Sequence, residues 1–436
     1  MRFALNRARR PAWWALAVAM MAAMLVLIAP QAWHARPFGA ASLELQARRY
    51  VSLALALRRF SPDDLDAYFG PPDLAAAPGS LPALRADVQV LAAELASAET
   101  RSPQPRQARL LARVKQLDAL LGLLAAPRAR DFDAEAAAVF GLLAAGAMPA
   151  ARPAAHARAR QQLAALLPGT GQLAARLAAY RQRFLIPPGQ RPAVFARALA
   201  ECRAHTLAHW PLPADEAISI SWTNAVPAAW HVYLGQHRSS LRINPAAVAD
   251  PAAALDLACH EAYPGHHAQF VLMDTAAGGV AVEDQIVLLR SPQSILREGA
   301  ANHGIAMAFP PAERAAFMAS RLFPLAGLAA SEARRHAEVN RLMGQLSTAM
   351  VPILRRYRDG SLPRQAAMAA LADEALVSSP DALLDFFDSH GALVLGYSVA
   401  QERVAADLTT ASDRWQALAL MMQTMDLSAL QPPPAS

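Results

Sequence analysis

Residues 255–270 read LDLACHEAYPGHHAQF, and the first half of this stretch has the leucines and alanines of a buried helix. The helical pattern carries His260 and Glu261 and then meets Pro264 and Gly265. Proline removes a backbone donor from a helix, and glycine permits dihedral angles that other residues avoid. We therefore expect a helix that is distorted at this proline-glycine pair.

The histidines of this stretch suggest a metal site. In the zinc-peptidase pattern H-E-x-x-H, two histidines at i and i+4 bind the metal and the glutamate is the general base. Here Pro264 stands at i+4 from His260, and the next histidines are His266 and His267. On a regular helix the i+7 position rises ~10 Å, too far for two imidazoles to share one ion. If the distortion absorbs two extra residues, the i+6 histidine fits instead. We predict His260 and His266 as ligands and Glu261 as the general base.

Two neighbouring residues, His267 and Cys259, each have two possible roles. His267 is predicted to support the ligands or to contact substrate, and the reverse assignment, with His267 as ligand in place of His266, stays open. Cys259 is either a thiolate ligand or, as we prefer, a small buried helix residue. The other cysteine is Cys202, and nothing in the sequence shows that the two pair.

The string HEAYPGHH resembles the HExxPGHH signature of the bacterial domain of unknown function 885 family, which is related to glutamate-ligand zinc peptidases. Residues 50–60 (YVSLALALRRF), 63–74 (DDLDAYFGPPDL) and 296–310 (LREGAANHGIAMAFP) also resemble this family. The resemblance covers nearly the whole chain after its N-terminal segment. It implies that Glu298 is the third ligand, which completes a His2Glu set with one open position for water.

Several further residues are candidates for the site. Glu283 and Asp284 are the nearest rivals of Glu298, which could also be an ordinary solvated helix glutamate. His303 is either a substrate contact or a packed histidine.

An oxyanion formed during hydrolysis needs a hydrogen-bond donor. Tyr397, in LVLGYSVAQERV, resembles a C-terminal tyrosine segment of the family and is the first candidate. His390 and Arg242 follow it, although each of the three, taken alone, is more often structural than catalytic.

The fold class predicted is mainly α, a multi-helix zinc-peptidase-like domain with one small antiparallel sheet beside the active-site helix. Residues 42–210 read as helices punctuated by prolines, and Ser61-Pro62 is expected to begin one of them. Residues 217–244 alternate apolar and polar side chains, which predicts a hairpin or meander. Residues 211–430 form the catalytic part, unless 42–430 is one compact domain.

This hairpin is expected at the edge of the cleft, where an edge strand can pair with an extended peptide. Its aromatic residues are predicted to belong to the core rather than to set specificity; they are Trp222, Trp230 and Tyr233.

The net charge of +6 does not indicate nucleic acid. Five of the positive charges lie in the first 36 residues, and the remainder is nearly neutral with no basic stripe. The five are Arg2, Arg7, Arg9, Arg10 and Arg36.

An unbroken apolar run from Trp13 to Ala29 follows Arg7, Arg9 and Arg10. Its length is close to the ~17–25 residues that span a bilayer. The positive-inside rule then predicts a single-pass anchor, residues 1–36, in the inner membrane with the catalytic part in the periplasm. The alternative is a secretory signal cleaved near Gly39-Ala40-Ala41, which would release the protein.

The sequence thus predicts a membrane-anchored zinc metallopeptidase with one Zn²⁺ ion, acting on a peptide or small amide substrate. One alternative is a zinc amidase or esterase with the same site. Another is a non-catalytic, metal-stabilised binding protein, although an intact H-E pair argues against it because a purely structural metal site needs no general base.

Overall fold

The computed structural model of this protein describes residues 40–99, 104–127, 131–141, 153–226, 228–276 and 279–424. The predicted membrane anchor lies outside these residues. Among the described residues, no helix is both long and apolar enough to cross a membrane. The predicted mainly helical fold with small sheets is confirmed.

The helices are α2 (Ala40–Leu55), α3 (Leu81–Glu99), α4 (Pro105–Ala125), α5 (Phe132–Phe140), α6 (Pro153–Leu166), α7 (Leu173–Gln182), α8 (Arg191–Leu207), α9 (Pro251–Glu261), α10 (His266–Asp274), α11 (Pro292–Ala308), α12 (Pro311–Phe317), α13 (Phe323–Leu325), α14 (Ala333–Gln345), α15 (Val351–Arg358), α16 (Arg364–Asp373), α17 (Pro380–His390), α18 (Val399–Thr409) and α19 (Arg414–Thr424). The strands are β1 (Leu65–Tyr68), β2 (Ala217–Trp222), β3 (Ala229–Gly235), β4 (Arg238–Ile243) and β5 (Ile286–Leu288).

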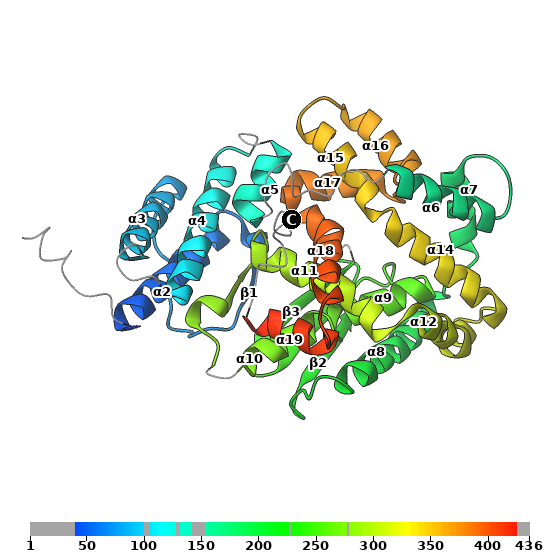
Figure 1. Ribbon diagram of the computed structural model, residues 1–436, viewed down its shortest axis with the longest axis horizontal. Coiled ribbons are helices and arrows are strands. Elements are labelled where there is room, and N and C mark those ends of the chain that lie inside the picture. The colour runs from blue at the N-terminus through cyan, green and yellow to red at the C-terminus, as the bar shows by residue number, and fades with distance from the viewer. Residues whose placement is uncertain are drawn as a thin grey trace, which may run out of the picture.

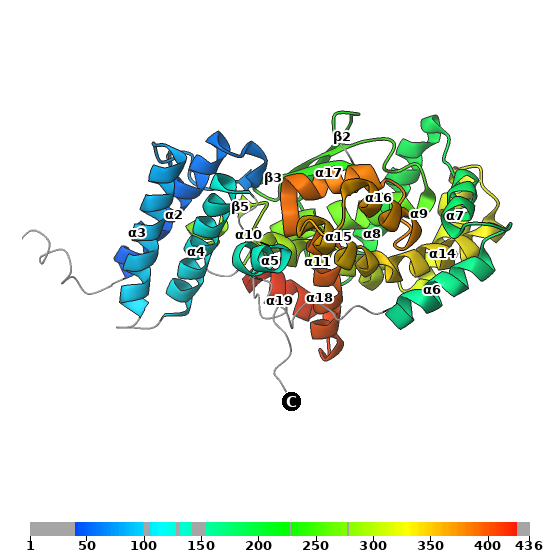
Figure 2. The same ribbon diagram turned by 90° about the horizontal axis from the view of Figure 1, so that it is seen from above.

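Helices far apart in sequence share one core. In Figures 1 and 2, α2, α3 and α4 gather at one end, while α6 and α7 lie at the other end beside α14. Helices α9, α10 and α11 lie between these ends with the strands. The cluster of buried apolar side chains runs from Leu43 to Met422. The helices before residue 210 therefore do not form a unit of their own in space.

The helices α9 and α11 begin in the same way. Pro251 and Pro292 occupy their first positions, where a missing N–H costs nothing. Asp250 precedes α9 and accepts hydrogen bonds from two backbone N–H groups of its first turn. Ser291 caps α11 by accepting from Ser294 N at 3.1 Å. Both starts can be recognised in the sequence because proline and capping residue are adjacent.

The three-stranded sheet has the order β2-β4-β3, so β3 is an edge strand. Strands β3 and β4 form the predicted antiparallel hairpin, with Gln236 and His237 at positive φ in the turn. Strand β2 pairs with β4 in parallel, from Ala217 opposite Arg238 to Trp222 opposite Ile243. The expectation of a purely antiparallel sheet is therefore wrong, because alternation predicts strands but not the direction in which they pair.

A second sheet, β1-β5, was not expected from the sequence. Residues Pro62–Asp64 form only a single 3-10 turn, and the chain then extends into β1 instead of continuing as the predicted helix. The reason is a distant partner: the buried Asp64 carboxylate accepts from Arg290 at 2.6 and 2.7 Å, and its carbonyl accepts from Leu289 N. Local sequence cannot reveal a contact across more than two hundred residues.

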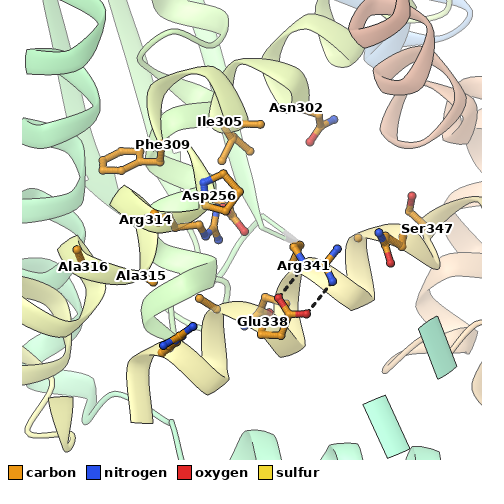
Figure 3. Close-up of a pocket in the computed structure, with 18 of the residues that line it drawn as sticks. Asp256, Asn302, Ile305, Phe309, Arg314, Ala315, Ala316, Glu338, Arg341 and Ser347 are labelled. Atoms are coloured by element: carbon orange, nitrogen blue, oxygen red, sulfur yellow. Dashed lines mark hydrogen bonds and ion pairs between the residues drawn. The ribbon is translucent and has the colours of Figure 1, made fainter. Parts of the chain in front are cut away.

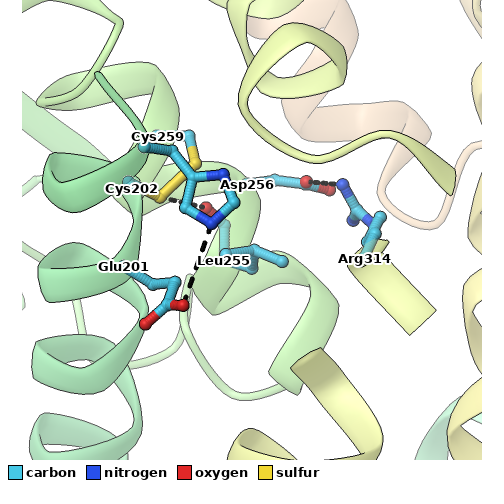
Figure 4. Close-up of a disulfide and its surroundings, with 7 residues drawn as sticks. Glu201, Cys202, Leu255, Asp256, Cys259 and Arg314 are labelled. Atoms are coloured by element: carbon cyan, nitrogen blue, oxygen red, sulfur yellow. Dashed lines mark hydrogen bonds and ion pairs between the residues drawn. A yellow bond between two sulfur atoms is a disulfide. The ribbon is translucent and has the colours of Figure 1, made fainter. Parts of the chain in front are cut away.

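Cys202 of α8 and Cys259 of α9 form a disulfide (Figure 4), which was not expected from the sequence. Their Cα atoms are 5.4 Å apart, and 57 positions separate them in sequence. Cys259 is fully buried, as we preferred, but it is not a small apolar packing residue with a free thiol. Its pairing excludes the thiolate-ligand alternative and ties α8 to α9 one residue before His260.

We expect reduction of this disulfide to lower the free energy of unfolding by about 4 kcal/mol, because the chain-entropy cost of closing such a loop no longer burdens the unfolded state. Urea unfolding of the full chain with and without dithiothreitol measures this. The Cys202→Ser/Cys259→Ser double variant is the control, since its unfolding midpoint should not respond to reductant. Equal wild-type midpoints in both conditions would contradict the prediction.

Candidate metal centre

The distortion expected at the proline-glycine pair is present. Between α9 and α10 the chain leaves the helix over residues 262–265, and the Tyr263–Pro264 peptide bond is cis. Gly265 N donates to Cys259 O at 3.0 Å, a span of six residues where a helix has four. Ala268 N donates to Ala262 O at 3.0 Å across the same span. The turn therefore absorbs two extra residues.

This turn has room only for glycine at two places. A Cβ on Gly265 would lie 1.7 Å from the carbonyl oxygen of His260, far inside van der Waals contact. On the other side, a Cβ on Gly304 of α11 would lie 2.7 Å from Cγ of Pro264. Gly265 is thus explained by the tight fold of the turn on itself, and Gly304 by the close approach of α11 to Pro264.

The turn brings two imidazoles to one carboxylate. His260 Nε2 lies 3.4 Å from Glu298 Oε2, and His266 Nε2 lies 3.4 Å from Glu298 Oε1. Charge-assisted hydrogen bonds are shorter, at ~2.7–2.9 Å. Two donors bound tetrahedrally to one ion by ~2.0–2.1 Å bonds are separated by about 3.4 Å. Glu298 Oε2 is also buried without a hydrogen-bond partner among the described residues. This donor set fits a metal ion.

His260, His266 and Glu298 are called the triad below. Their surroundings control the charges that they carry. Burial by itself raises the pKa of Glu298, but His266 and His260 outweigh it and hold that pKa well below the usual range. Burial lowers the pKa of His260, and the Glu298 carboxylate outweighs this and raises it to about 9. Burial raises the pKa of Glu261, with His260 and His266 only opposing the shift. The triad thus favours a bound positive charge.

Asn302 supports the triad from the next turn of α11. Its side chain hydrogen-bonds His260, and its Nδ2 donates to the Glu298 carbonyl at 2.9 Å. Partners of this kind orient a ligating imidazole and fix its tautomer. The sequence interpretation did not assign this role, although the i+4 spacing from Glu298 is a signal that it could have used.

The rivals of Glu298 lie elsewhere. Glu283 accepts two hydrogen bonds from Arg106 at 2.8 Å, and Asp284 pairs with Arg113. These pairs join α4 to the segment before β5, and neither carboxylate belongs to the group formed by His260, His266 and Glu298.

His267 is fully buried and faces away from the triad. Its Nδ1 lies 2.7 Å from Ser239 Oγ and its Nε2 lies 2.8 Å from Glu216 Oε2. Both ring nitrogens are occupied, so no atom is left for a metal or a substrate. The geometry makes His267 a positioning residue that anchors the first turn of α10, rather than a ligand or a substrate contact.

A chain of hydrogen bonds extends from this histidine to His231, which lies beside the triad. Glu216 also accepts from Tyr263 Oη at 2.5 Å and pairs with Arg203. At the other end, Ser239 Oγ lies 2.9 Å from Nε2 of His231, whose ring is 6.0 Å from that of His266. Because Glu216 accepts only, its partner His267 donates through Nε2.

Of the three oxyanion candidates, Tyr397 is the one that lies in the electric field of the triad. It ends the 3-10 helix η8 (Gly391–Tyr397), and a Cβ on Gly396 would be 2.9 Å from Cβ of Glu298. Burial raises the pKa of Tyr397 well above its ordinary value, and the carboxylates of Glu298, Glu261 and Asp66 add to the shift. Its side chain is nevertheless 37% exposed.

The other two candidates are placed differently. His390 Nδ1 lies 3.2 Å from the Phe386 carbonyl, and its ring stacks on that side chain. Arg242 is exposed on β4, with its guanidinium 6.0 Å from the Trp230 ring.

The three aromatic residues of the hairpin, which were predicted to belong to the core, are not all buried. Tyr233 is a core residue that donates to Asp274 at 2.6 Å, whereas Trp222 and Trp230 are only half-buried. Burial lowers the pKa of His303 to about 4, with a smaller contribution from Arg414. Its Nε2 is buried without a hydrogen-bond partner among the described residues.

Asp66 is a site residue that the sequence interpretation missed. It lies on β1, and burial raises its pKa to about 6, against the opposing effect of Arg297 and His266. The carboxylates of Glu298 and Glu261 raise it further. No local signal could have found it, since nearly two hundred residues separate it from the first triad histidine.

A large cavity lies next to Asn302 of α11 (Figure 3). Its volume is about 1190 Å³, and α9, α11, α12, α14 and α18 line it. Asp256 and Arg314 form an ion pair of 2.6 Å in its wall, and Glu338 pairs with Arg341. It reaches the triad only through Asn302, the residue that supports His260. The triad residues do not line this cavity.

No protein-family model matches the chain, and comparison with curated proteins finds no match. The solved structures similar to this chain include one named "The crystal structure of the putative lipoprotein from Colwellia psychrerythraea", at 15% identity and a TM-score of 0.49. The similarity covers 81% of this chain and 66% of that one, so the chain spans just under two thirds of its length. A likeness of this degree carries no inference about function.

We expect Glu216→Gln to destabilise the protein by about 3 kcal/mol at neutral pH. Burial disfavours the Glu216 carboxylate, but hydrogen bonds from His267, Tyr263 and Arg203 outweigh it and lower the pKa to about 2. A depressed pKa stabilises the folded state above the unfolded value of 4.5 and ceases to do so as pH falls towards 2.

Urea unfolding of wild type and variant between pH 7 and pH 2.5 measures this. The difference between the two should shrink steadily below pH 4.5. A difference that stays constant down to pH 2.5 would show that the charge of Glu216 does not contribute to stability.

Proposed function

We propose that this protein is a zinc-dependent hydrolase, most specifically a metallopeptidase, with one Zn²⁺ held by His260, His266 and Glu298. The observation that carries the proposal is the separation of 3.4 Å between each imidazole nitrogen and a Glu298 oxygen, with Glu261 buried beside them. Two imidazoles and a carboxylate suit zinc and leave one position open. Bound zinc would supply a water of lowered pKa and polarise the scissile carbonyl.

Glu261 would act as the general base. It directly follows a ligand at the end of α9, and its burial raises the pKa of the carboxyl. A carboxylate of raised basicity takes a proton from water more readily and returns it to the leaving amine. A site that served only to hold a metal would have no use for such a group.

Tyr397 would stabilise the oxyanion. Because its pKa lies well above 10, its hydroxyl keeps its proton at neutral pH and can donate a hydrogen bond. It is partly exposed, so a substrate can reach it. Its raised pKa comes from burial and from the same carboxylates that surround the triad, which supports a position at the reacting atoms.

A peptide substrate is supported by the neighbouring edge strand. Strand β3 is paired on one side only, by β4, and its His231 lies against His266. An extended peptide can add to such an edge through backbone hydrogen bonds. A zinc amidase or esterase is the alternative, and a non-catalytic metal-stabilised binding protein is a third.

The proposed setting is outside the cytoplasm, anchored in the inner membrane by residues 1–36 or released after signal cleavage. The disulfide between Cys202 and Cys259 supports an oxidising compartment, because cytosolic thiols are kept reduced. The HEAYPGHH string leads us to propose membership of the domain of unknown function 885 family as well.

Glu261→Gln should retain one zinc per chain and lower hydrolysis of peptides by 10²- to 10⁴-fold, because it removes the base but not a ligand. Metal analysis of the purified full chain and a peptide-library digest measure both. His266→Ala should lose the zinc, while the exposed His209→Ala should keep both zinc and activity. Wild-type protein without zinc, or full activity of Glu261→Gln, would refute the mechanism.

Tyr397→Phe should lower kcat by 10²- to 10³-fold with little change in KM, because the lost hydrogen bond forms only in the transition state. Steady-state kinetics on a cleaved peptide measure this. His390→Asn is the matched control and should stay within a few-fold of wild type. If kcat is unchanged in Tyr397→Phe, another group stabilises the oxyanion.

A further inference from the structure

Asp66 is the extra residue of a β-bulge. Along β1, Leu65 lies opposite Leu288 and Ala67 lies opposite Val287, so two steps on β1 match one step on β5. The residue between them is left out of the pairing. Bulges bend a strand and re-aim a side chain, and they are frequent next to active sites. The flanking Leu65 and Ala67 stay buried in the core, while Asp66 is only half-buried.

Contacts between aromatic side chains hold β1 beside the triad. Phe69 follows β1, and its ring lies 5.1 Å from that of Tyr233 and 6.1 Å from that of Phe270. Phe270 is one helical turn beyond His266 on α10, and it also stacks on His231 at 5.8 Å. The bulge therefore lies on the side of α10 that carries the ligand. Electrostatic interactions of Asp66 with the triad and with Tyr397 agree with this position.

The Asp66 carboxylate has no hydrogen bond or ion pair within the described residues. Other carboxylates nearby are fully engaged: Asp64 by Arg290 and Glu216 by three donors. The nearest cation, Arg297, makes no ion pair with it; its guanidinium lies 5.3 Å from the Phe270 ring. A partly buried carboxylate without a partner loses hydration without gaining a hydrogen bond.

Asp66 is also not a metal ligand in this arrangement. The described residues bring His260, His266 and Glu298 within 4.8 Å of one another, and Asp66 does not join that group. It thus lies beyond ligand distance but in the field of the same site, which is where a group of the substrate would be bound.

We infer that Asp66 binds the protonated amino group at the free N-terminus of a peptide substrate. The inference rests on the proposed hydrolase function and narrows it to removal of one or a few residues from free N-termini. An ammonium group donates strong charge-assisted hydrogen bonds to a carboxylate, whereas an acetylated N-terminus or an internal peptide bond brings no charge to this point. Asp66 would then set both the substrate class and the register of cleavage.

The test compares matched peptides with free and N-acetylated termini on the zinc-loaded full chain. Wild type should cleave the free members at least tenfold faster by kcat/KM. Asp66→Asn should lower kcat/KM on free peptides by ~10- to 100-fold and leave acetylated ones unchanged, since a hydrogen bond to a charged group has about that effect. Asp63→Asn, an exposed acid on the same segment, is the matched control and should behave as wild type.

Three results would overturn the inference. The first is equal cleavage, by the wild-type protein, of a peptide with a free N-terminus and its N-acetylated counterpart. The second is an equal loss on both members in Asp66→Asn, which would make Asp66 a positioning residue for His266. The third is loss of zinc from Asp66→Asn, which would make it part of the metal site.

A binding measurement separates this inference from the proposed function. Fluorescence polarisation of peptides labelled at the C-terminus is measured on Glu261→Gln with and without Asp66→Asn. Tighter binding of the free-amine peptide, lost with Asp66→Asn, supports the inference even if no peptide is ever hydrolysed. Equal binding of free and acetylated peptides refutes it, whatever the hydrolysis experiments give.

Discussion

Two backbone hydrogen bonds that span six residues hold the centre of this molecule in shape. They close the turn between α9 and α10 and replace the four-residue bonds that a continuous helix would have made. In a continuous helix that did not absorb these two residues, His266 at i+6 would lie on another face from His260, and no carboxylate could meet both. The glycine at the end of the turn and the glycine of α11 opposite it permit the close approach that this requires.

The triad residues are held from several directions, because a turn alone would leave them free to move. The disulfide ties α9 to α8, Asn302 holds His260 from α11, and the buried His267 locks the start of α10 onto β4 through Ser239. Each support comes from a different element. A metal site built this way has its ligand geometry determined before an ion binds, which reduces the entropy lost on binding.

Carboxylates around the site differ in partners, and this difference separates their roles. Glu216 has three donors and a low pKa, so it is structural. Glu298 faces two imidazoles and stays ionised, as a ligand must. Glu261 and Asp66 lack such neutralising contacts, and burial raises the pKa of each. The proton-transfer role proposed for one and the substrate-binding role inferred for the other both depend on that lack of a permanent partner.

Sequence alone determined the local features: the helices and their proline starts, the β3-β4 hairpin, the distortion at Pro264-Gly265 and the grouping of His260 with His266. These follow from backbone chemistry and short spacings, which act within a few residues. Glu298 was predicted only from the family resemblance, because no short spacing links a residue of α11 to this turn. Only the tertiary structure decided the pairing of Cys202 with Cys259, the strand at 65–68, the burial of His267 and the approach of Asp66. Each of these depends on a partner fifty or more residues away, or on which face of a helix is covered, and short-range patterns carry no record of either.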